Sequence, residues 1–154
     1  MKKILTTLAI LACLASNLFA QELPKSKVVF FRTSDFFEFR HGFNVFNDTT
    51  KMIRLWPNTF EVLEVDSKMT KFWAKTEVKT NFIIDLRPNH IYFVRGGLDA
   101  GVFMGRPRFE VLTIDEFRNV FAKKKSLRRK FKELGYESVD DFIKAYEGLN
   151  FTNL

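Results

Sequence analysis

The stretch from Phe82 to Thr113 constrains the fold of this chain more than any other. It contains two short runs rich in β-branched and aromatic residues, 82–86 and 91–95, with Pro88 and Asn89 between them. Proline presets the backbone at the first corner of a turn, and asparagine tolerates the conformation needed at the second. The stretch therefore predicts two antiparallel strands joined by a tight turn.

Similar runs occur along most of the chain. They are 27–32, 36–46, 52–56, 60–65, 71–78, 82–86, 91–95 and 108–112. Strands this short, with no helix between them, predict a mainly β fold, namely an antiparallel β-sandwich of about eight short strands. The first run is apolar on both faces, which predicts a central strand. The run 71–78 alternates apolar and polar residues, which predicts a half-buried strand with Trp73 on its wetter face.

The sequence pattern changes after Thr113 to a helical one. Thr113 and Glu116 form a capping box, and apolar residues then recur at helical spacing. Residues typical of helix boundaries follow at Gly135, Ser138 and Gly148. The pattern predicts a C-terminal helical segment over 114–149, with a first helix that continues to Gly135. We expect this segment to lie outside the β-sandwich domain at 27–113, so that the sheet folds without it.

The first twenty residues have the composition of a secretory signal peptide. Lys2 and Lys3 precede a mostly apolar segment that ends at Ala20, a small residue suited to a cleavage site. We therefore expect an exported protein of the periplasm or cell envelope, with no transmembrane span in the mature chain, because the apolar segment is short. The alternative is lipid anchoring at Cys13, which follows a loose lipobox. Cys13 is the only cysteine, so neither a disulfide nor a thiolate site is expected after cleavage.

Three segments together show a resemblance to a known family. They are VVFFR at 28–32, IYFVR at 91–95 and FMGRPRFEV at 103–111. In order and spacing they resemble an uncharacterised bacterial envelope family, catalogued as domain of unknown function 2846, over residues 27–113. The resemblance implies a small exported β-sandwich, often lipid-anchored, with no established activity and no catalytic residues. The turn at 56–59 departs from the expected Pro-Gly pattern because it has no glycine.

Positive charge is concentrated in two places. Segment 123–132 carries seven positive charges in ten residues, with Leu127 and Phe131 on one predicted helix face. One interpretation is a basic amphipathic surface that binds anionic lipid, glycan or an acidic partner. The other is a solvated helix face that packs its apolar side on the sheet. The glycine-rich stretch 96–105 is either an anion-holding loop or a sharp strand crossing. The candidate binding residues are Arg95, Arg106, Arg108, Lys123, Lys124, Lys125, Arg128, Arg129, Lys130 and Lys132.

Residues suited to catalysis are scarce. His41 and His90 are the only histidines, and no spacing typical of a zinc site or a serine nucleophile occurs. We therefore expect no metal, no cofactor and no enzymatic activity. The formal charge of +7 falls to +5 without Lys2 and Lys3, which is too mild to predict nucleic-acid binding.

The expected function is a non-catalytic exported binding or structural module of the bacterial cell envelope, with an envelope protein as its partner. One alternative is an electrostatic binder of anionic lipid or glycan that uses the basic helix at 123–132. The other is a hydrolase with an unrecognised site.

Overall fold

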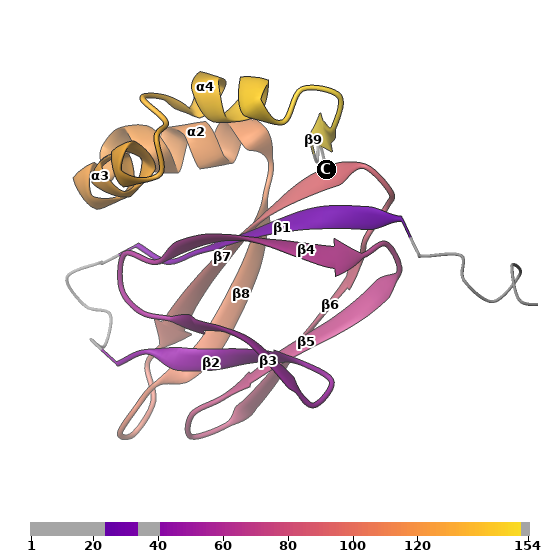
Figure 1. The fold of residues 1–154 in the computed structure, drawn as a ribbon. Coiled ribbons are helices and arrows are strands. Elements are labelled where there is room, and N and C mark those ends of the chain that lie inside the picture. Colours follow the sequence, from indigo (N-terminus) through magenta and orange to yellow (C-terminus); the bar gives the residue numbers. More distant parts are fainter. Residues whose placement is uncertain (1–23, 34–40, 152–154) are drawn as a thin grey trace, which may run out of the picture.

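The computed structural model describes residues 24–33 and 41–151, which form two β-sheets and a layer of helices (Figure 1). The strands are β1 (Lys25–Phe31), β2 (Phe43–Asn47), β3 (Thr50–Leu55), β4 (Phe60–Asp66), β5 (Met69–Lys75), β6 (Lys79–Asp85), β7 (His90–Asp99), β8 (Arg106–Leu112) and β9 (Asn150–Phe151). The helices are α2 (Ile114–Lys123), α3 (Lys125–Glu133) and α4 (Val139–Ala145). None of these helices is long and apolar enough to cross a membrane.

The mainly β fold, its sandwich arrangement and its C-terminal helical segment were predicted from the sequence and are confirmed. The predicted leader at 1–20, with Cys13 and Ala20, lies outside the described residues, and so do the first residues of the predicted run 36–46. Cleavage after Ala20 and lipid anchoring at Cys13 therefore stay predictions.

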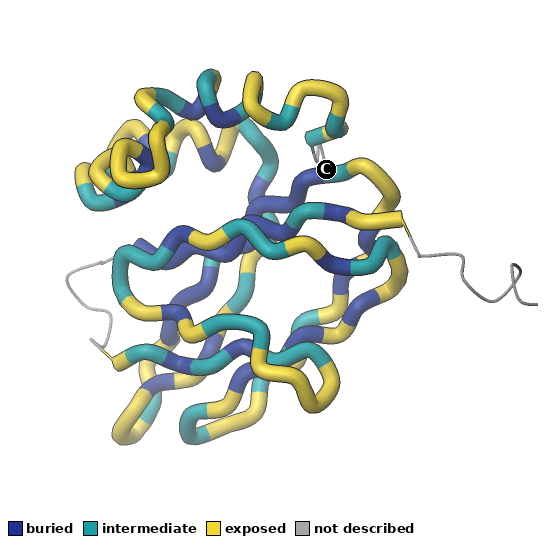
Figure 2. Tube along the Cα trace, viewed as in Figure 1, coloured by how far each residue is buried: buried dark blue, intermediate teal, exposed yellow. Residues whose placement is uncertain are grey.

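The sheets and the helices stack as three layers. The first sheet has the strand order β4-β1-β7-β8, with β9 against β7, and the second has the order β3-β2-β5-β6. Side chains of both sheets, among them Phe30 and Phe72, fill the core between them. A second core, which includes Val29 and Phe93, lies between the first sheet and the helices. The first sheet is therefore buried on both faces, as the dark central strands of Figure 2 show.

β1 occupies the central position that its two apolar faces predicted. It pairs with β4 in antiparallel and with β7 in parallel, so that Val29 lies between Val62 and Phe93. The parallel pairing departs from the antiparallel expectation. A parallel pair requires a long crossover connection. Here the chain passes twice through the second sheet, as β2-β3 and as β5-β6, before it returns as β7.

Two strand boundaries differ from the prediction. β7 continues through Gly96 and Gly97, so these glycines do not form the strand crossing, and the turn lies at 100–105 instead. A Cβ on Gly96 would lie 2.6 Å from Cδ1 of Leu55, which explains a glycine within a buried strand. β5 ends at Lys75, three residues earlier than predicted, because the chain turns there into the hairpin with β6.

The helical segment begins with the predicted capping box. The Glu116 N–H donates to Oγ1 of Thr113 over 3.2 Å, and the Thr113 N–H donates to the Glu116 carboxylate over 2.8 Å. The predicted first helix is broken at Lys124 into α2 and α3. In a continuous helix Phe121 and Phe131 would lie about 15 Å apart. The turn at Lys124 brings their ring centres within 4.6 Å, so both rings enter the same core.

The helices are part of the core. The Phe117 ring stacks on Phe93 with a centroid distance of 4.2 Å and meets Phe31 edge-on at 5.2 Å. Phe131 and Phe142 are fully buried, and their ring centres lie 4.7 and 5.8 Å from that of Phe60. Removing residues 114–151 would expose one whole face of the first sheet. We therefore expect the sheet not to fold without the helices, which reverses the expectation drawn from the sequence.

Replacing Phe117 by alanine tests this coupling. Because the ring touches aromatic side chains of both the sheet and the helices, the free energy of unfolding should fall by about 3–5 kcal/mol, as measured by urea denaturation. The control is Asn119→Ala, at an exposed position of the same helix, which should change stability by no more than about 0.5 kcal/mol. Similar small effects in both variants would contradict a shared core.

Candidate functional site

The outer face of α3 carries the largest group of predicted binding residues. Leu127 and Phe131 are fully buried in the second core, so the apolar side of α3 points inward. Residues three, four and seven positions apart share a helix face. The exposed residues with this spacing are Lys125, Arg128, Arg129 and Lys132. The segment therefore packs its apolar side inward and presents its cations to solvent.

Some of these cations have carboxylate partners. Nζ of Lys130 lies 3.0 Å from Glu133, and Nζ of Lys132 lies 3.0 Å from Glu137. Nε of Arg129 lies 3.8 Å from Glu133, which is a loose pair. Ion pairs at an exposed surface contribute little to stability because water and salt screen them. These three pairs therefore reduce the charge of the face without fixing its side chains.

Three other cations of the predicted set lie farther from the carboxylates that the structure describes. Within the part of the chain that the structure describes, no carboxylate lies within 4.0 Å of Lys123, Lys125 or Arg128. The Arg128 guanidinium donates to the carbonyl of Ala122 at the C-terminal end of α2, where backbone dipoles favour positive charge. Lys124 is the residue between the two helices, and its N–H donates to carbonyls of the last turn of α2. An excess of positive charge is thus left on this face.

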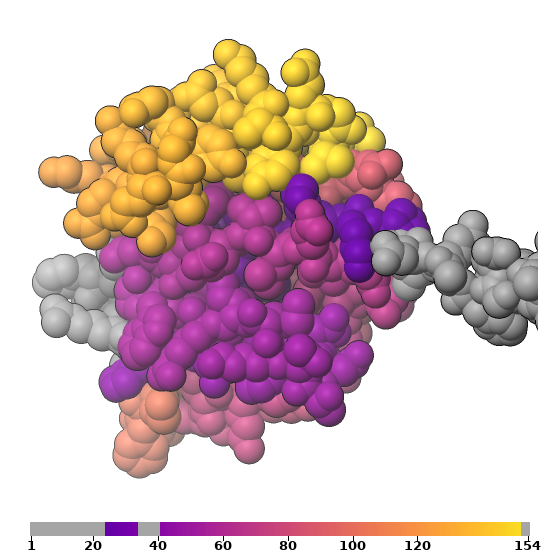
Figure 3. Space-filling model, viewed as in Figure 1, coloured from indigo at the N-terminus to yellow at the C-terminus, as the bar shows by residue number. Residues whose placement is uncertain are grey.

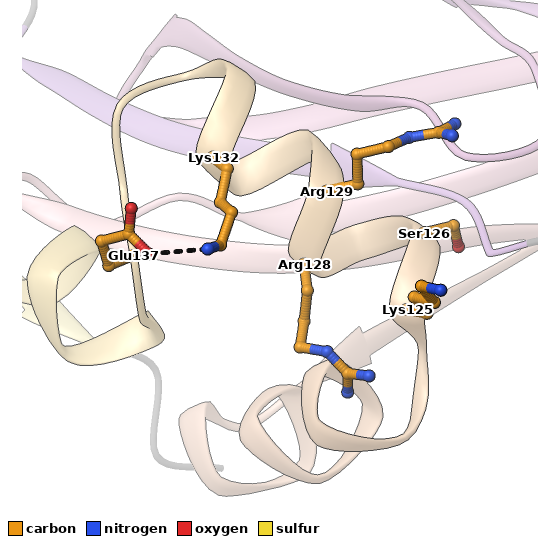
Figure 4. A pocket seen from close by; sticks show the side chains of 6 residues that line it. All are labelled: Lys125, Ser126, Arg128, Arg129, Lys132 and Glu137. Carbon is orange, nitrogen blue, oxygen red and sulfur yellow. Dashed lines mark ion pairs between the residues drawn. The ribbon is translucent and has the colours of Figure 1, made fainter.

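A groove of about 630 Å³ lies beside this face of α3 (Figure 4). The described residues that line it are Lys125, Ser126, Arg128, Arg129, Lys132 and Glu137. Figure 4 shows Arg128 and Arg129 projecting to different sides of α3, with Glu137 paired to Lys132 across the start of the next loop. Four of these side chains are cationic and the one acid among them is paired, so the lining suits an anionic group.

Arg95, Arg106 and Arg108 do not join this cluster. Arg106 and Arg108 lie on β8 near the β7–β8 turn, at the end of the sandwich opposite the helices (Figure 1). Nη1 of Arg108 lies 3.1 Å from the carboxylate of Asp99. Arg95 lies within β7, and its Nη2 is 3.3 Å from Oγ1 of Thr33. Arg106 and Arg108 therefore lie at the end of the molecule opposite the helical group, and Arg95, within β7, belongs to neither.

The glycine-rich loop already holds an anion, which is the carboxylate of Glu77. The Val102 N–H donates to Oε2 over 2.9 Å, and the N–H groups of Phe103, Met104 and Gly105 donate to Oε1, the last over 3.2 Å. These backbone hydrogen bonds, that of Met104 foremost, hold the pKa of Glu77 below its ordinary value of 4.5. An external anion at these amides would have to displace Glu77.

Two glycines are required by this arrangement. A Cβ on Gly101 would lie 2.7 Å from Cα of Gly105 and 2.5 Å from Oε2 of Glu77. Gly105 has a φ of 77°, a conformation that favours glycine. The Thr76 hydroxyl also donates to the Gly105 carbonyl. The β7–β8 turn is therefore attached to the β5–β6 turn beside it.

Sequence reasoning did not find Glu77. The residue was assigned to the polar face of a strand, and it lies 25 residues before the first amide that it accepts from. No local pattern links the two segments. The β5–β6 and β7–β8 turns belong to different sheets, and the stacking of these sheets brings the turns to the same end of the sandwich.

Comparison with known proteins adds no relative. No protein family, curated protein or solved structure matches this chain significantly. The resemblance to domain of unknown function 2846 therefore stays a prediction.

Among residues 24–33 and 41–151, no group of three or more histidine, cysteine, aspartate or glutamate side chains is arranged to hold a metal ion. The features that remain to indicate a function are the cationic face of α3 and the loop held by Glu77.

Replacing Glu77 by glutamine tests whether its carboxylate keeps the β7–β8 turn in place. The substitution removes the negative charge and one acceptor oxygen, so the protection of the amides at 102–105 against hydrogen exchange should fall by about tenfold or more. The matched control is Glu61→Gln, an exposed carboxylate on β4. A loop that is equally protected in both variants would show that Glu77 does not hold it.

The lowered pKa of Glu77 predicts a pH dependence of the loop. Because the folded-state pKa lies below the ordinary value of 4.5, the stabilisation is present above that value and is lost as the pH falls through the folded pKa. Protection factors at 102–105 in the unmodified chain should therefore drop in acid. In the Glu77→Gln variant the same titration should produce no step.

Proposed function

We propose that this protein is a non-catalytic exported binding module of the bacterial cell envelope, and that the cationic face of α3 binds phosphate or carboxylate groups of anionic lipids or glycans. The observation that carries the proposal is that, within the described residues, Lys125 and Arg128 have no carboxylate within 4.0 Å and lie on a helix whose apolar side is already buried. Like charges this close repel each other, and an anionic ligand relieves the repulsion. The leader-like composition of residues 1–20 supports export.

The buried position of Leu127 and Phe131 favours surface contact over insertion. Since α3 has no apolar side left to bury in a bilayer, a ligand meets the ends of long charged side chains. Guanidinium groups bind phosphate and carboxylate through paired hydrogen bonds. Arg128 and Arg129 both line the groove and supply such groups. Contact of this kind is mainly electrostatic and weakens as ionic strength rises.

Two other functions compete with this proposal. An acidic protein would satisfy the same cations, and the experiment below has to separate it from a lipid or glycan. A hydrolase would need acid and base groups that converge on a substrate. The described lining of the groove includes no histidine, and its carboxylate, Glu137, is paired with Lys132. This lining favours binding over acid–base chemistry.

Charge reversal on α3 tests the proposal. The double variant Lys125→Glu with Arg128→Glu should bind about tenfold or more weakly to vesicles of phosphatidylglycerol in phosphatidylcholine, or to polygalacturonate, because a basic residue near an anionic surface contributes about 1 kcal/mol. The full chain would be titrated with each probe over a series of salt concentrations. The matched control is Lys51→Glu with Lys71→Glu, two exposed lysines of the second sheet.

The control has the same net charge as the α3 variant, so it separates a specific face from a general charge effect. Equal loss of binding in the two double variants would contradict the assignment of α3. Binding that does not change with salt would contradict the electrostatic mode. If neither probe binds at low salt, the lipid or glycan proposal fails, and the acidic protein becomes the better candidate.

A further inference from the structure

The end of the sandwich opposite the helices carries an exposed apolar tip. It consists of Val102, Phe103 and Met104 in the β7–β8 turn and Val78 in the adjacent β5–β6 turn. Val102 and Phe103 expose 75% and 80% of their surface. Figure 3 shows the β7–β8 turn projecting from the lower left of the molecule. A single exposed apolar residue is ordinary, but three consecutive ones in one turn, beside a fourth in the adjacent turn, suit an interaction site.

The backbone N–H groups of this tip are already hydrogen-bonded within the protein, which lowers the free-energy cost of moving the tip out of water. An unpaired amide costs free energy in an apolar medium, so a loop that enters lipid must satisfy its own N–H groups. The four successive amides at 102–105 all donate to Glu77, as described above. The carboxylate also holds the loop in one conformation, which lowers the entropy cost of inserting it.

Basic residues lie around the tip. Lys75 and Lys79 are directly opposite each other in the β5–β6 ladder, where two like charges are unfavourable. Arg106 follows the tip at the start of β8. No carboxylate in the described ranges lies within 4.0 Å of these three side chains. Nζ of Lys79 lies 4.2 Å from the centre of the Trp73 ring. The tip is therefore apolar at its end and cationic at its base.

We infer that this tip inserts into the surface of a lipid bilayer that carries anionic headgroups. Val102 and Phe103 enter the apolar boundary, and Lys75, Lys79 and Arg106 remain at the level of the phosphates. A convex projection suits a fluid bilayer, which deforms around it, and the cationic base complements the negative headgroups. The site is separate from the cationic face of α3, which lies at the other end of the molecule (Figure 1).

The first test removes the apolar end of the tip. In the full chain, Val102→Ser with Phe103→Ser should weaken binding to vesicles of phosphatidylglycerol in phosphatidylcholine by about tenfold or more, since burial of two apolar side chains is lost. The matched control is Met69→Ser with Ile83→Ser, which removes two apolar residues of the second sheet with exposed fractions of 72% and 61%. Equal weakening in both variants would overturn the inference.

The second test reports insertion directly, because α3 is also proposed to bind anionic headgroups. Cys13 is replaced by serine, and Phe103→Cys or, as the control, Ile83→Cys is labelled with an environment-sensitive nitrobenzoxadiazole dye. On anionic vesicles the emission should increase and shift to the blue at position 103 only. The Lys125→Glu, Arg128→Glu background should keep this change. Unchanged emission at 103 while the protein is vesicle-bound would overturn the inference but leave the α3 proposal intact.

Discussion

Burial of the first sheet on both faces is the constraint on which the rest of the structure depends. Its two central strands, β1 and β7, present apolar side chains to both sides, so a single covering layer would leave half of them in water. The second sheet covers one face and the helices cover the other. At the edge of the helical layer, partial burial, helped by a hydrogen bond with Tyr136, raises the pKa of Tyr146 to about 12.

Among the described residues, this layering leaves all charged side chains but one at least partly exposed. Arg32 is fully buried, and its Nη1 donates to the carbonyl of His41 over 2.7 Å. Its guanidinium carbon lies 5.5 Å from the centre of the Phe43 ring. A buried guanidinium requires such partners, because an unpaired charge in a core is strongly unfavourable. The surface cations are under no such requirement, because water solvates them.

Local chemistry accounts for most of what the sequence predicted correctly. The turns at 56–59 and at Pro88 and Asn89 are expected from residue type, and Asn58 and Asn89 both have positive φ values. The capping box at Thr113 was predicted for the same reason, since its two partners are three residues apart. Gly135, predicted to end a helix, has a φ of 88°. Each of these features depends on a few consecutive residues.

The features that were missed depend on residues far apart in the sequence. The parallel pairing of β1 with β7 joins segments that are more than sixty residues apart, and no pattern within either strand specifies its neighbour. Glu77 reads as an ordinary polar strand residue until two hairpins bring it to the β7–β8 turn. The break at Lys124 is explained by the position of the Phe121 and Phe131 rings in a core that a helical spacing cannot reveal. The apolar tip could not be predicted from the sequence for the same reason, since it combines residues of the β5–β6 and β7–β8 turns.

The order of strands in the first sheet also governs how the chain can fold. β1 comes first among the described strands, yet its neighbour β7 is made only after the whole second sheet. Contacts between such distant segments close slowly, because a long loop must be ordered before they form. Until β7 arrives, β1 has one unpaired edge that is apolar on both sides, which is a template for pairing with another chain. Docking of β7 onto β1 removes this unpaired edge and completes the buried centre of the first sheet.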